Sequence, residues 1–207
     1  MPLRSHRLDL GPYCRTVPER RLLEAFLTLL DRRPYDAISV LDVVEQAHMS
    51  KSAFYQRFHN KADLARTLFG TVLTALLDHV GRAIDAEPEP WRKIRAGLQA
   101  YVDLCLDHPG AGRFLLLSAP GTPAGFESLR LSAHRTFADM IRTRLRFPAA
   151  DPKRLEWLAA AIVGAVNEAV VHALLQAEPP DAAERAELVD CLNQVLVHAV
   201  LAVTSAP

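Results

Sequence analysis

The residues whose types and spacing suggest a chemical role lie within residues 39–64. Four polar or basic side chains of a short predicted helix there remain available for a groove: Lys51, Ser52, Gln56 and Arg57. An arginine can pair with guanine through two hydrogen bonds, and a glutamine can pair with adenine in the same way. This set therefore suits the reading of base edges in a DNA groove.

Two short helices must position these side chains. Ser39 and Ser50 are N-cap residues by type, and each precedes residues with helical apolar spacing. A tight turn is predicted at His48-Met49, and Phe54 and Phe58 fall on the core side of the second helix. Two short helices joined by a turn of three or four residues form a helix-turn-helix, which places its second helix in the major groove.

The helices on either side of this pair complete the N-terminal domain. Thr16 and Glu19 form a capping-box pattern that begins a helix, which Arg33-Pro34 is expected to stop. Asn60 is expected to cap a longer helix that runs through Val80. We predict an N-terminal arm and helix-turn-helix domain over residues 1–62, and a second domain over residues 63–207. The basic residues of the arm could follow a DNA groove or form a solvated tail: Arg4 and Arg7.

The rest of the chain also has helical apolar spacing and no alternating strand pattern. The segment 87–90, Glu-Pro-Glu-Pro, is the clearest break. Further helices are predicted over residues 91–107, 112–118, about 123–147, 152–177 and 182–203. The expected fold class is all-α, with about nine helices: a three-helix helix-turn-helix head and a helical bundle for ligand binding and dimerisation.

Composition excludes several other classes of protein. The 207 residues carry no net charge, but the first 61 have 10 Lys/Arg and 7 Asp/Glu, whereas the rest have 14 and 17. Three separated cysteines, and histidines without ligand spacing, predict no disulfide framework, no metal site and no cofactor. No GxSxG, P-loop or HExxH motif is present, so no catalytic residue is assigned. We expect a cytoplasmic protein without membrane segments.

The run of residues 39–64 resembles the DNA-binding signature of the TetR family of transcriptional regulators. The resemblance depends above all on Ser50-Lys51, Tyr55-x-x-Phe58 and Asn60-Lys61-x-x-Leu64, and it extends over about residues 16–69. The resemblance implies phosphate contacts for Ser39, Tyr55 and Lys61. It implies base contacts for Ser52, Ala53, Gln56 and Arg57.

Three positions depart from the usual pattern of this family. Pro34 and His48 stand where glycine is common, and Leu41 stands where a basic residue is frequent. Histidine tolerates a left-handed backbone better than most residues, so we expect His48 to make the turn. Pro34 cannot adopt a positive φ and must end the first helix differently.

The last two predicted helices are more apolar than the core of one protomer requires. In TetR-like proteins the corresponding helices form a four-helix bundle with those of a second copy. The predicted dimer interface comprises Gly164, His172, Leu192, Val195 and Ala199.

A ligand pocket is also implied by the resemblance. Its predicted lining combines aromatic, soft and polar side chains: Tyr101, Cys105, Phe114, His134, Phe137, Trp157 and Glu168. Glu168 has four alternative roles: pairing across the dimer, pairing with His172, lining the cavity, or contact with water.

The sequence thus predicts a homodimeric, sequence-specific regulator of transcription that binds double-stranded, near-palindromic operator DNA. We expect a repressor that is released when a small hydrophobic effector enters the second domain. One alternative is a TetR-like DNA-binding protein without an effector. The other is a helical enzyme that retains a vestigial helix-turn-helix.

Overall fold

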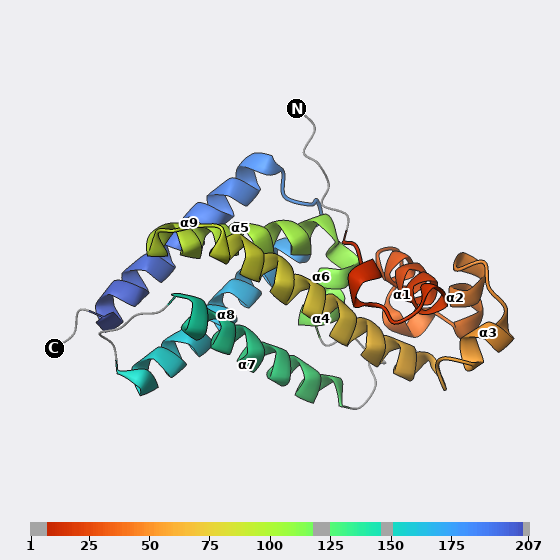
Figure 1. The fold of residues 1–207 in the computed structure, drawn as a ribbon. Helices are drawn as coiled ribbons and strands as arrows, with labels where there is room; N and C mark the ends of the chain where they lie inside the picture. The colour runs from red at the N-terminus through yellow and green to blue at the C-terminus, as the bar shows by residue number, and fades with distance from the viewer. Residues whose placement is uncertain (1–7, 118–124, 146–150, 205–207) are drawn as a thin grey trace. The chain divides into compact units, whose positions relative to one another are not determined.

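The computed structural model of the protein describes residues 8–117, 125–145 and 151–204. Within these residues the chain forms nine α-helices and no strand, which confirms the predicted all-α fold class (Figure 1). Two short 3-10 helices, η1 (Gly11–Tyr13) and η2 (Tyr35–Ala37), precede α1 and α2. The α-helices are α1 (Val17–Leu30), α2 (Val40–Gln46), α3 (Lys51–Tyr55), α4 (Lys61–Asp85), α5 (Pro90–Asp107), α6 (Pro109–Leu116), α7 (Phe126–Leu145), α8 (Pro152–Leu174) and α9 (Ala182–Thr204).

The chain divides into two compact units, and the helix α4 passes from one to the other. The first unit extends to Ala75 and also contains residues 107–129, because α6 packs against α1. The second unit contains residues 76–106 and the chain from Arg130 onward. The predicted domain boundary after residue 62 is a different division, made by motif and not by packing, and it stays a prediction. The predicted arm residues Arg4 and Arg7 lie outside the described residues.

Helix boundaries follow the local capping signals. The Thr16 hydroxyl accepts a hydrogen bond of 3.3 Å from the backbone N–H of Glu19, which confirms the predicted start of α1. Pro34 has a φ of −65° in extended backbone and lies beyond the end of α1 at Leu30. The helix α6 begins at Pro109, three residues before the predicted Gly112, because proline suits the first turn of a helix. The predicted ends of α6 and α7, at 118, 123 and 147, lie outside the described residues.

Aromatic side chains form the centre of the first unit. Phe26 on α1 and Phe69 on α4 each contact Phe114 on α6 edge to face, with ring centroids 6.3 and 6.2 Å apart. Phe126 at the start of α7 joins the same cluster. Such edge-to-face contacts favour a fixed geometry in addition to the area that they bury. Phe114, which we predicted to line a ligand pocket, is therefore a core residue of the first unit.

The helices α1 and α6 approach each other very closely at Gly110. The Asp31 carboxylate accepts a hydrogen bond of 2.7 Å from the backbone N–H of Gly110. A Cβ atom at residue 110 would lie 2.3 Å from Asp31 Oδ1 and 2.5 Å from its backbone nitrogen. Only glycine permits this contact, so Gly110 fixes the position of α6 against the end of α1.

The second unit is built from the C-terminal part of α4, most of α5 and α7, and the long helices α8 and α9. Asp151 and Asp181 cap α8 and α9, since their carboxylates accept hydrogen bonds from backbone N–H groups in the first turn of each helix. Val166 and Val170 of α8 and Val189 and Val200 of α9 are buried in the protomer. The two helices are also long and apolar enough, by length and composition alone, to cross a membrane. Such helices also occur in soluble proteins, so this finding is weak and the predicted absence of membrane segments stays a prediction.

Candidate nucleic-acid interface

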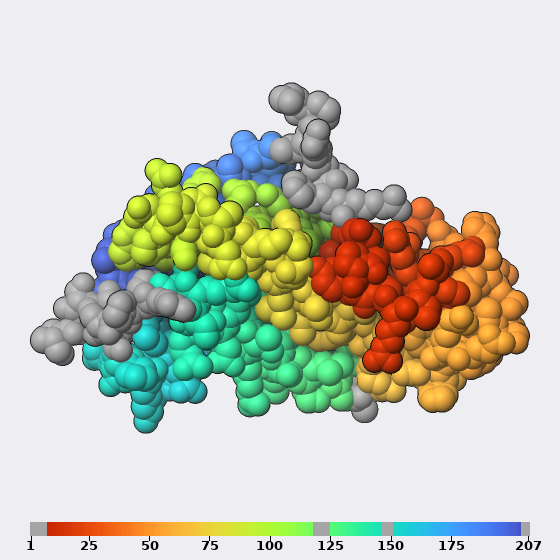
Figure 2. Space-filling model, in the orientation of Figure 1, coloured from red at the N-terminus to blue at the C-terminus, as the bar shows by residue number. Residues whose placement is uncertain are grey.

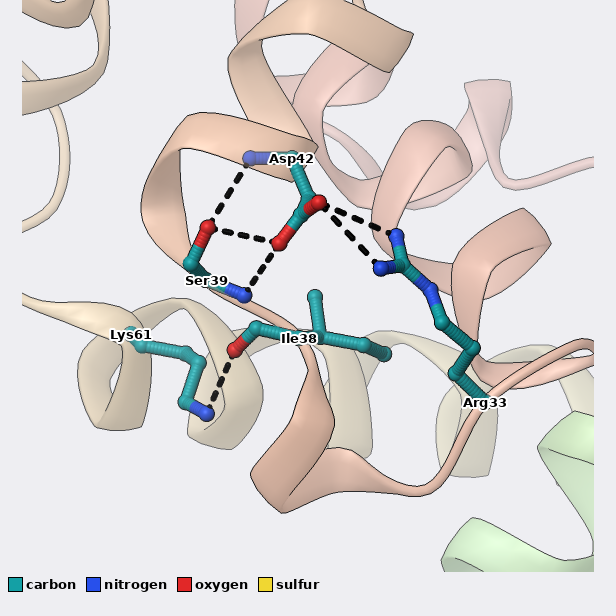
Figure 3. A network of polar contacts seen from close by, with 5 residues as sticks. All are labelled: Arg33, Ile38, Ser39, Asp42 and Lys61. Carbon is teal, nitrogen blue, oxygen red and sulfur yellow. Dashed lines mark hydrogen bonds and ion pairs between the residues drawn. The ribbon is translucent and has the colours of Figure 1, made fainter.

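The start of α2 is held by a reciprocal capping box between Ser39 and Asp42 (Figure 3). The Ser39 hydroxyl accepts a hydrogen bond of 3.1 Å from the Asp42 N–H and donates one of 2.6 Å to its carboxylate. The Ser39 N–H donates to the same carboxylate oxygen at 2.7 Å. Ser39, to which the resemblance assigned a phosphate contact, is exposed but uses its hydroxyl in this cap.

Arg33 completes this network from the segment that follows α1. Both terminal nitrogens of its guanidinium lie 3.2 Å from Asp42 Oδ1 (Figure 3). The hydrogen bonds from Ser39, followed by those from Arg33, lower the pKa of the Asp42 carboxyl to about 2. Asp42 is therefore ionised at neutral pH, where its carboxylate holds the first turn of α2.

Lys61, at the start of α4, holds the segment that leads into α2. Its ammonium donates hydrogen bonds of 2.9 Å to the carbonyl oxygen of Tyr35 and of 2.6 Å to that of Ile38 (Figure 3 shows the second). It also lies 4.2 Å from the centre of the Tyr35 ring. Desolvation lowers the pKa of Lys61. The predicted phosphate ligand thus has a structural role in the free protein, where two of its three donors are used.

The turn between α2 and α3 has the conformation expected for His48. This residue has a φ of 51°, and no other described non-glycine residue has a positive φ. Arg21 on α1 stabilises the turn, since its guanidinium donates to the carbonyl oxygens of Ala47 at 2.7 Å and His48 at 3.3 Å. Sequence reasoning did not find Arg21, because no motif links it to a turn 26 residues away.

The predicted reading helix α3 is only five residues long. The Ser50 hydroxyl caps it by accepting a hydrogen bond of 3.1 Å from the Ala53 N–H. Phe54 and Phe58 are buried, as predicted, with ring centroids 5.7 Å apart. The side chains left exposed on this helix and its C-terminal turn are Lys51, Ser52, Tyr55, Gln56 and Arg57, whereas Ala53 is half-buried. The buried phenylalanines thus fix one side of α3 in the core. The polar residues on its other side remain exposed, as in helices that read DNA.

Tyr55 and Arg57 each form a contact within the protein that bears on the role predicted for it. Tyr55 is 56% exposed, and its ring packs edge to face on Phe54 at 5.2 Å. Its hydroxyl group is therefore carried at a fixed position on the surface, which suits the phosphate contact that the resemblance implies. Arg57 follows the last turn of α3 and donates a hydrogen bond of 3.1 Å to the Ala53 carbonyl oxygen.

The second unit contains an apolar cavity of about 70 Å³ among α4, α5, α7, α8 and α9. Of the predicted pocket residues, Tyr101 and Phe137 line it, with ring centroids 5.5 Å apart. Its other lining residues were missed as a set: Val80, Ile84, Lys93, Ile94, Gly97, Leu98, Met140, Ile141, Leu145, Ile162, Val163, Val166, Asn167 and Leu196. Apart from Lys93 and Asn167 these are apolar residues of the usual core types, so no sequence signal separated them from the rest of the core.

The other predicted pocket residues lie elsewhere. Trp157 is 63% exposed, and Glu168 is also exposed, because both occupy the outer side of α8. Cys105 is buried beside Tyr101 but does not line the cavity, and burial raises the pKa of its thiol to about 12. His134 is exposed and forms a hydrogen bond of 2.9 Å with the Asn167 side chain.

A short chain of polar side chains begins in the wall of the cavity. The Tyr101 hydroxyl donates to Asn167 Oδ1, and Asn167 in turn contacts the His134 ring. Burial raises the pKa of Tyr101 well above its ordinary value, so the hydroxyl stays protonated. The hydroxyl group that borders the apolar cavity is thereby satisfied within the protein.

The predicted dimer residues divide between the surface and the core. Gly164 and His172 on α8 and Val195 on α9 are exposed, and Ala199 is half-buried. Leu192 is only 7% exposed and packs within its own protomer, so we remove it from the predicted interface. The helical spacing could not separate it from its neighbours because α9 is apolar on more than one side. Exposed apolar residues beside these positions are Trp157, Ala160, Ala161, Ala165 and Leu201.

Among the described residues, no group of three or more His, Cys, Asp or Glu side chains is placed to hold a metal ion. The chemical groups that the first unit presents are the exposed polar side chains of α3 and the basic residues near it. In this protein a capped α2, a turn with one residue in the left-handed conformation and a short exposed α3 follow one another. This arrangement is that of helix-turn-helix DNA-binding proteins.

Comparisons with known proteins agree with this class. Residues 22–68 match the model of a family described as bacterial regulatory proteins, tetR family. No curated protein matches the chain. Solved structures with the same fold include a TetR-family transcriptional regulator from Streptomyces coelicolor (15% identity, 93% of each chain covered, TM-score 0.73). Another is the regulatory protein TetR from Rhodobacter sphaeroides (18% identity, 89% of this chain and 99% of that chain covered, TM-score 0.69).

A third is described as the fatty acid degradation regulator FadR from Bacillus halodurans (12% identity, 89% and 96% covered, TM-score 0.72). At these identities the structures share the fold alone, while the family model identifies the head. The chain thus carries a tetR-family DNA-binding head and has the fold of TetR-family transcriptional regulators, which confirms the resemblance seen in the sequence.

Proposed function

We propose that this protein is a homodimeric repressor that binds a near-palindromic operator in the cytoplasm and is released by a small hydrophobic effector. The observation that carries the DNA-binding part is the exposed polar surface of α3 over buried Phe54 and Phe58. Gln56 is one candidate base reader, since it is exposed at the C-terminal cap of α3 and glutamine can pair with adenine.

Selection of bound duplexes from a random pool tests this function. We expect enrichment of a near-palindrome whose half-sites lie about one DNA turn, or a multiple of it, apart. Gln56→Ala should relax specificity at one position of each half-site, with a loss of about 1–3 kcal/mol against the preferred base. The matched control is Gln176→Ala, because Gln176 is exposed beyond the end of α8. A pool without enrichment would reject sequence-specific DNA binding.

The dimer proposal is supported by the exposed apolar residues of α8 and α9. Apolar surface of this kind on two adjacent helices is unfavourable in water unless a partner covers it. A symmetric pairing brings the same exposed surface of both protomers together, and Gly164 allows close approach because nothing lies within 4 Å of a Cβ atom built there.

The effector proposal is supported by the apolar cavity next to Tyr101. Because Glu168 lies outside it, a cation has no carboxylate partner among the lining residues, and a neutral or fatty molecule is favoured. The ligand must bind the released state better than the DNA-bound state, and a 100-fold preference corresponds to about 2.7 kcal/mol. A thermal-shift screen of fatty acids and neutral aromatics, with and without operator DNA, tests this. Leu98→Trp, which fills the cavity, should abolish any shift.

The small volume of the cavity supports a second candidate, a DNA-binding regulator without an effector. A ligand larger than a short hydrocarbon group would have to displace side chains that now pack together. Repression that persists with every compound of the screen, and no compound that raises the melting temperature, would favour this candidate.

A further inference from the structure

A polar groove in the first unit has no assigned role. Its volume is about 560 Å³, and it runs between the start of α1, the end of α3 and one side of α4. Figure 2 shows the N-terminal segment in red beside the orange and gold surface of the helices that follow it. The groove is lined by Tyr13, Arg15, Thr16, Glu19, Arg57, Phe58, Asp63, Arg66, Thr67, Gly70, Thr71 and Thr74.

Three arginines line this groove, from three different elements. Arg15 precedes α1, Arg57 follows α3 and Arg66 lies on α4, and all three are exposed. None has an ion pair among the described residues. Six arginines elsewhere do pair with a carboxylate, namely Arg20, Arg33, Arg82, Arg95, Arg142 and Arg144, whereas others such as Arg32, Arg92 and Arg154 also have no ion pair among the described residues. The distinctive feature of the groove is that three arginines from separate elements lie along it and none of them forms an ion pair.

The two carboxylates of the groove only partly neutralise these arginines. Glu19 accepts a hydrogen bond of 3.1 Å from the backbone N–H of Arg15, and Asp63 accepts one of 3.0 Å from the N–H of His59. Each carboxylate therefore serves a helix start. Three guanidinium groups against two carboxylates leave the lining with one net positive charge, and guanidinium groups bind phosphate oxygens well because they offer paired donors.

We propose that this arginine-lined groove binds phosphate groups, and that their source is the DNA backbone next to the bases read by α3. This inference rests on the proposed DNA-binding function. Arg57 supports the DNA source because it directly follows Gln56 of the reading surface yet lines the groove. The α4 side from Asp63 to Thr74 is about 16 Å long, and one strand places a phosphate every 3.4 Å or so along the duplex axis.

The proposal changes the role that the sequence assigned to Arg57. A base reader is expected to relax specificity when it is removed, whereas a phosphate ligand weakens binding to all sequences equally. Arg57→Gln should therefore keep the sequence preference of the protein and lower its affinity. In the proposed homodimer each substitution removes one phosphate contact from each protomer, so the slope of log affinity against log salt should fall by about 1.8 for each of Arg15→Gln, Arg57→Gln and Arg66→Gln.

Gly70 allows the groove to be tested without removing an arginine. It lies on the groove side of α4, and nothing lies within 4 Å of a Cβ atom built on it. Gly70→Glu places a carboxylate beside Arg66, one turn earlier, whereas Gly70→Gln has the same size and nearly the same helix propensity. We expect the Glu variant to bind operator DNA roughly tenfold more weakly than the Gln variant at low salt. Circular dichroism and melting curves establish that both variants fold.

The experiment measures fluorescence anisotropy of labelled operator duplex over a range of salt concentrations, for the full chain and these variants. Arg20→Gln, which removes an exposed arginine that is paired with Glu24, is the control and should leave the slope unchanged. A second arm titrates inorganic pyrophosphate into the DNA-free protein. Reduced slopes support the DNA source. Unchanged slopes, with pyrophosphate binding that the arginine variants abolish, assign the groove to a free phosphorylated ligand and overturn the DNA source.

Unchanged slopes without pyrophosphate binding overturn the proposal as a whole. The failure of this inference differs from the failure of the proposed function. If the parent protein binds no duplex specifically, the DNA-binding function is wrong. If the parent binds its operator and the groove variants bind it with the same salt slope, only the groove assignment is wrong.

Discussion

The guanidinium of Arg21 on α1 donates a hydrogen bond of 2.7 Å to the carbonyl oxygen of Ala47, at the end of α2. A second bond of 3.3 Å reaches the carbonyl oxygen of His48. The last carbonyl groups of a helix have no partner within it, so a cation there satisfies them and interacts favourably with the helix dipole. The turn that orients α3 is thus held by a side chain that is distant in sequence.

Replacement of Arg21 by methionine is expected to lower the free energy of unfolding by about 1 kcal/mol, because two backbone carbonyls lose a charged donor. Operator affinity should fall as well, since the orientation of α3 becomes less restricted. Urea denaturation followed by circular dichroism measures the first effect. Arg20→Met, next to it on α1 but paired only at the surface, serves as the control. Equal stability of the two variants would contradict the role of Arg21.

Substitutions at His48 test the left-handed backbone of the turn. His48→Val should be destabilising, by about 1 kcal/mol or more, since a β-branched side chain is strained at a φ of 51°. His48→Gly should be tolerated, because glycine adopts this conformation freely while it increases the entropy of the unfolded chain. Melting temperatures of both variants check this order. A valine variant that melts with the parent would show that the turn is not left-handed.

Two glycine-to-alanine substitutions should have opposite effects. Gly110→Ala should destabilise the first unit, since its Cβ would lie 2.5 Å from the backbone nitrogen of Asp31. Gly70→Ala should stabilise the protein by about 0.5–1 kcal/mol, because the helix gains propensity and the new methyl group meets no neighbour. Chemical denaturation of both variants tests the prediction. A destabilised Gly70→Ala variant would mean that the groove beside it is filled in solution.

The Asp42 carboxyl should make stability depend on pH in acid. Its pKa falls from an ordinary 3.8 to about 2 in the folded protein, mainly through hydrogen bonds from Ser39 and then through Arg33. Below pH 4 the unfolded chain binds this proton more readily than the folded chain does. The stabilisation is therefore complete above about pH 4 and is lost as the pH falls towards 2. Asp42→Asn should flatten the stability curve in this range, as measured by urea titrations at fixed pH.

Val195→Asp should dissociate the proposed dimer, because it places a charge among the exposed apolar residues of α8 and α9. Leu131→Asp on α7 is the matched control, since Leu131 is 56% exposed and Val195 is 55% exposed. Light scattering coupled to size-exclusion chromatography distinguishes monomer from dimer. The control should remain dimeric and bind DNA. If the Val195 variant remains dimeric as well, the interface lies elsewhere on the protein.

Local signals in the sequence were sufficient to predict the helices of the N-terminal DNA-binding head. Ser39, Ser50 and Asn60 cap the helices that the sequence predicted, because capping depends on residues three positions apart. The left-handed conformation of His48 followed from its residue type and its place between two helices. The burial of Phe54 and Phe58 followed from helical spacing. All of these properties depend on short-range geometry, which residue order fixes.

Only the tertiary structure decided how distant residues meet. In the folded chain the Lys61 ammonium donates to the carbonyl oxygens of Tyr35 and Ile38, and residue spacing could not identify these partners. The tertiary structure also buried Leu192 and exposed Trp157 and Glu168, because the rotation of an all-round apolar helix is set by the helices packed against it. The sequence by itself determined the helices and the DNA-binding head of this protein. The arginine groove and the apolar cavity exist only where separate segments pack together, which no local pattern encodes.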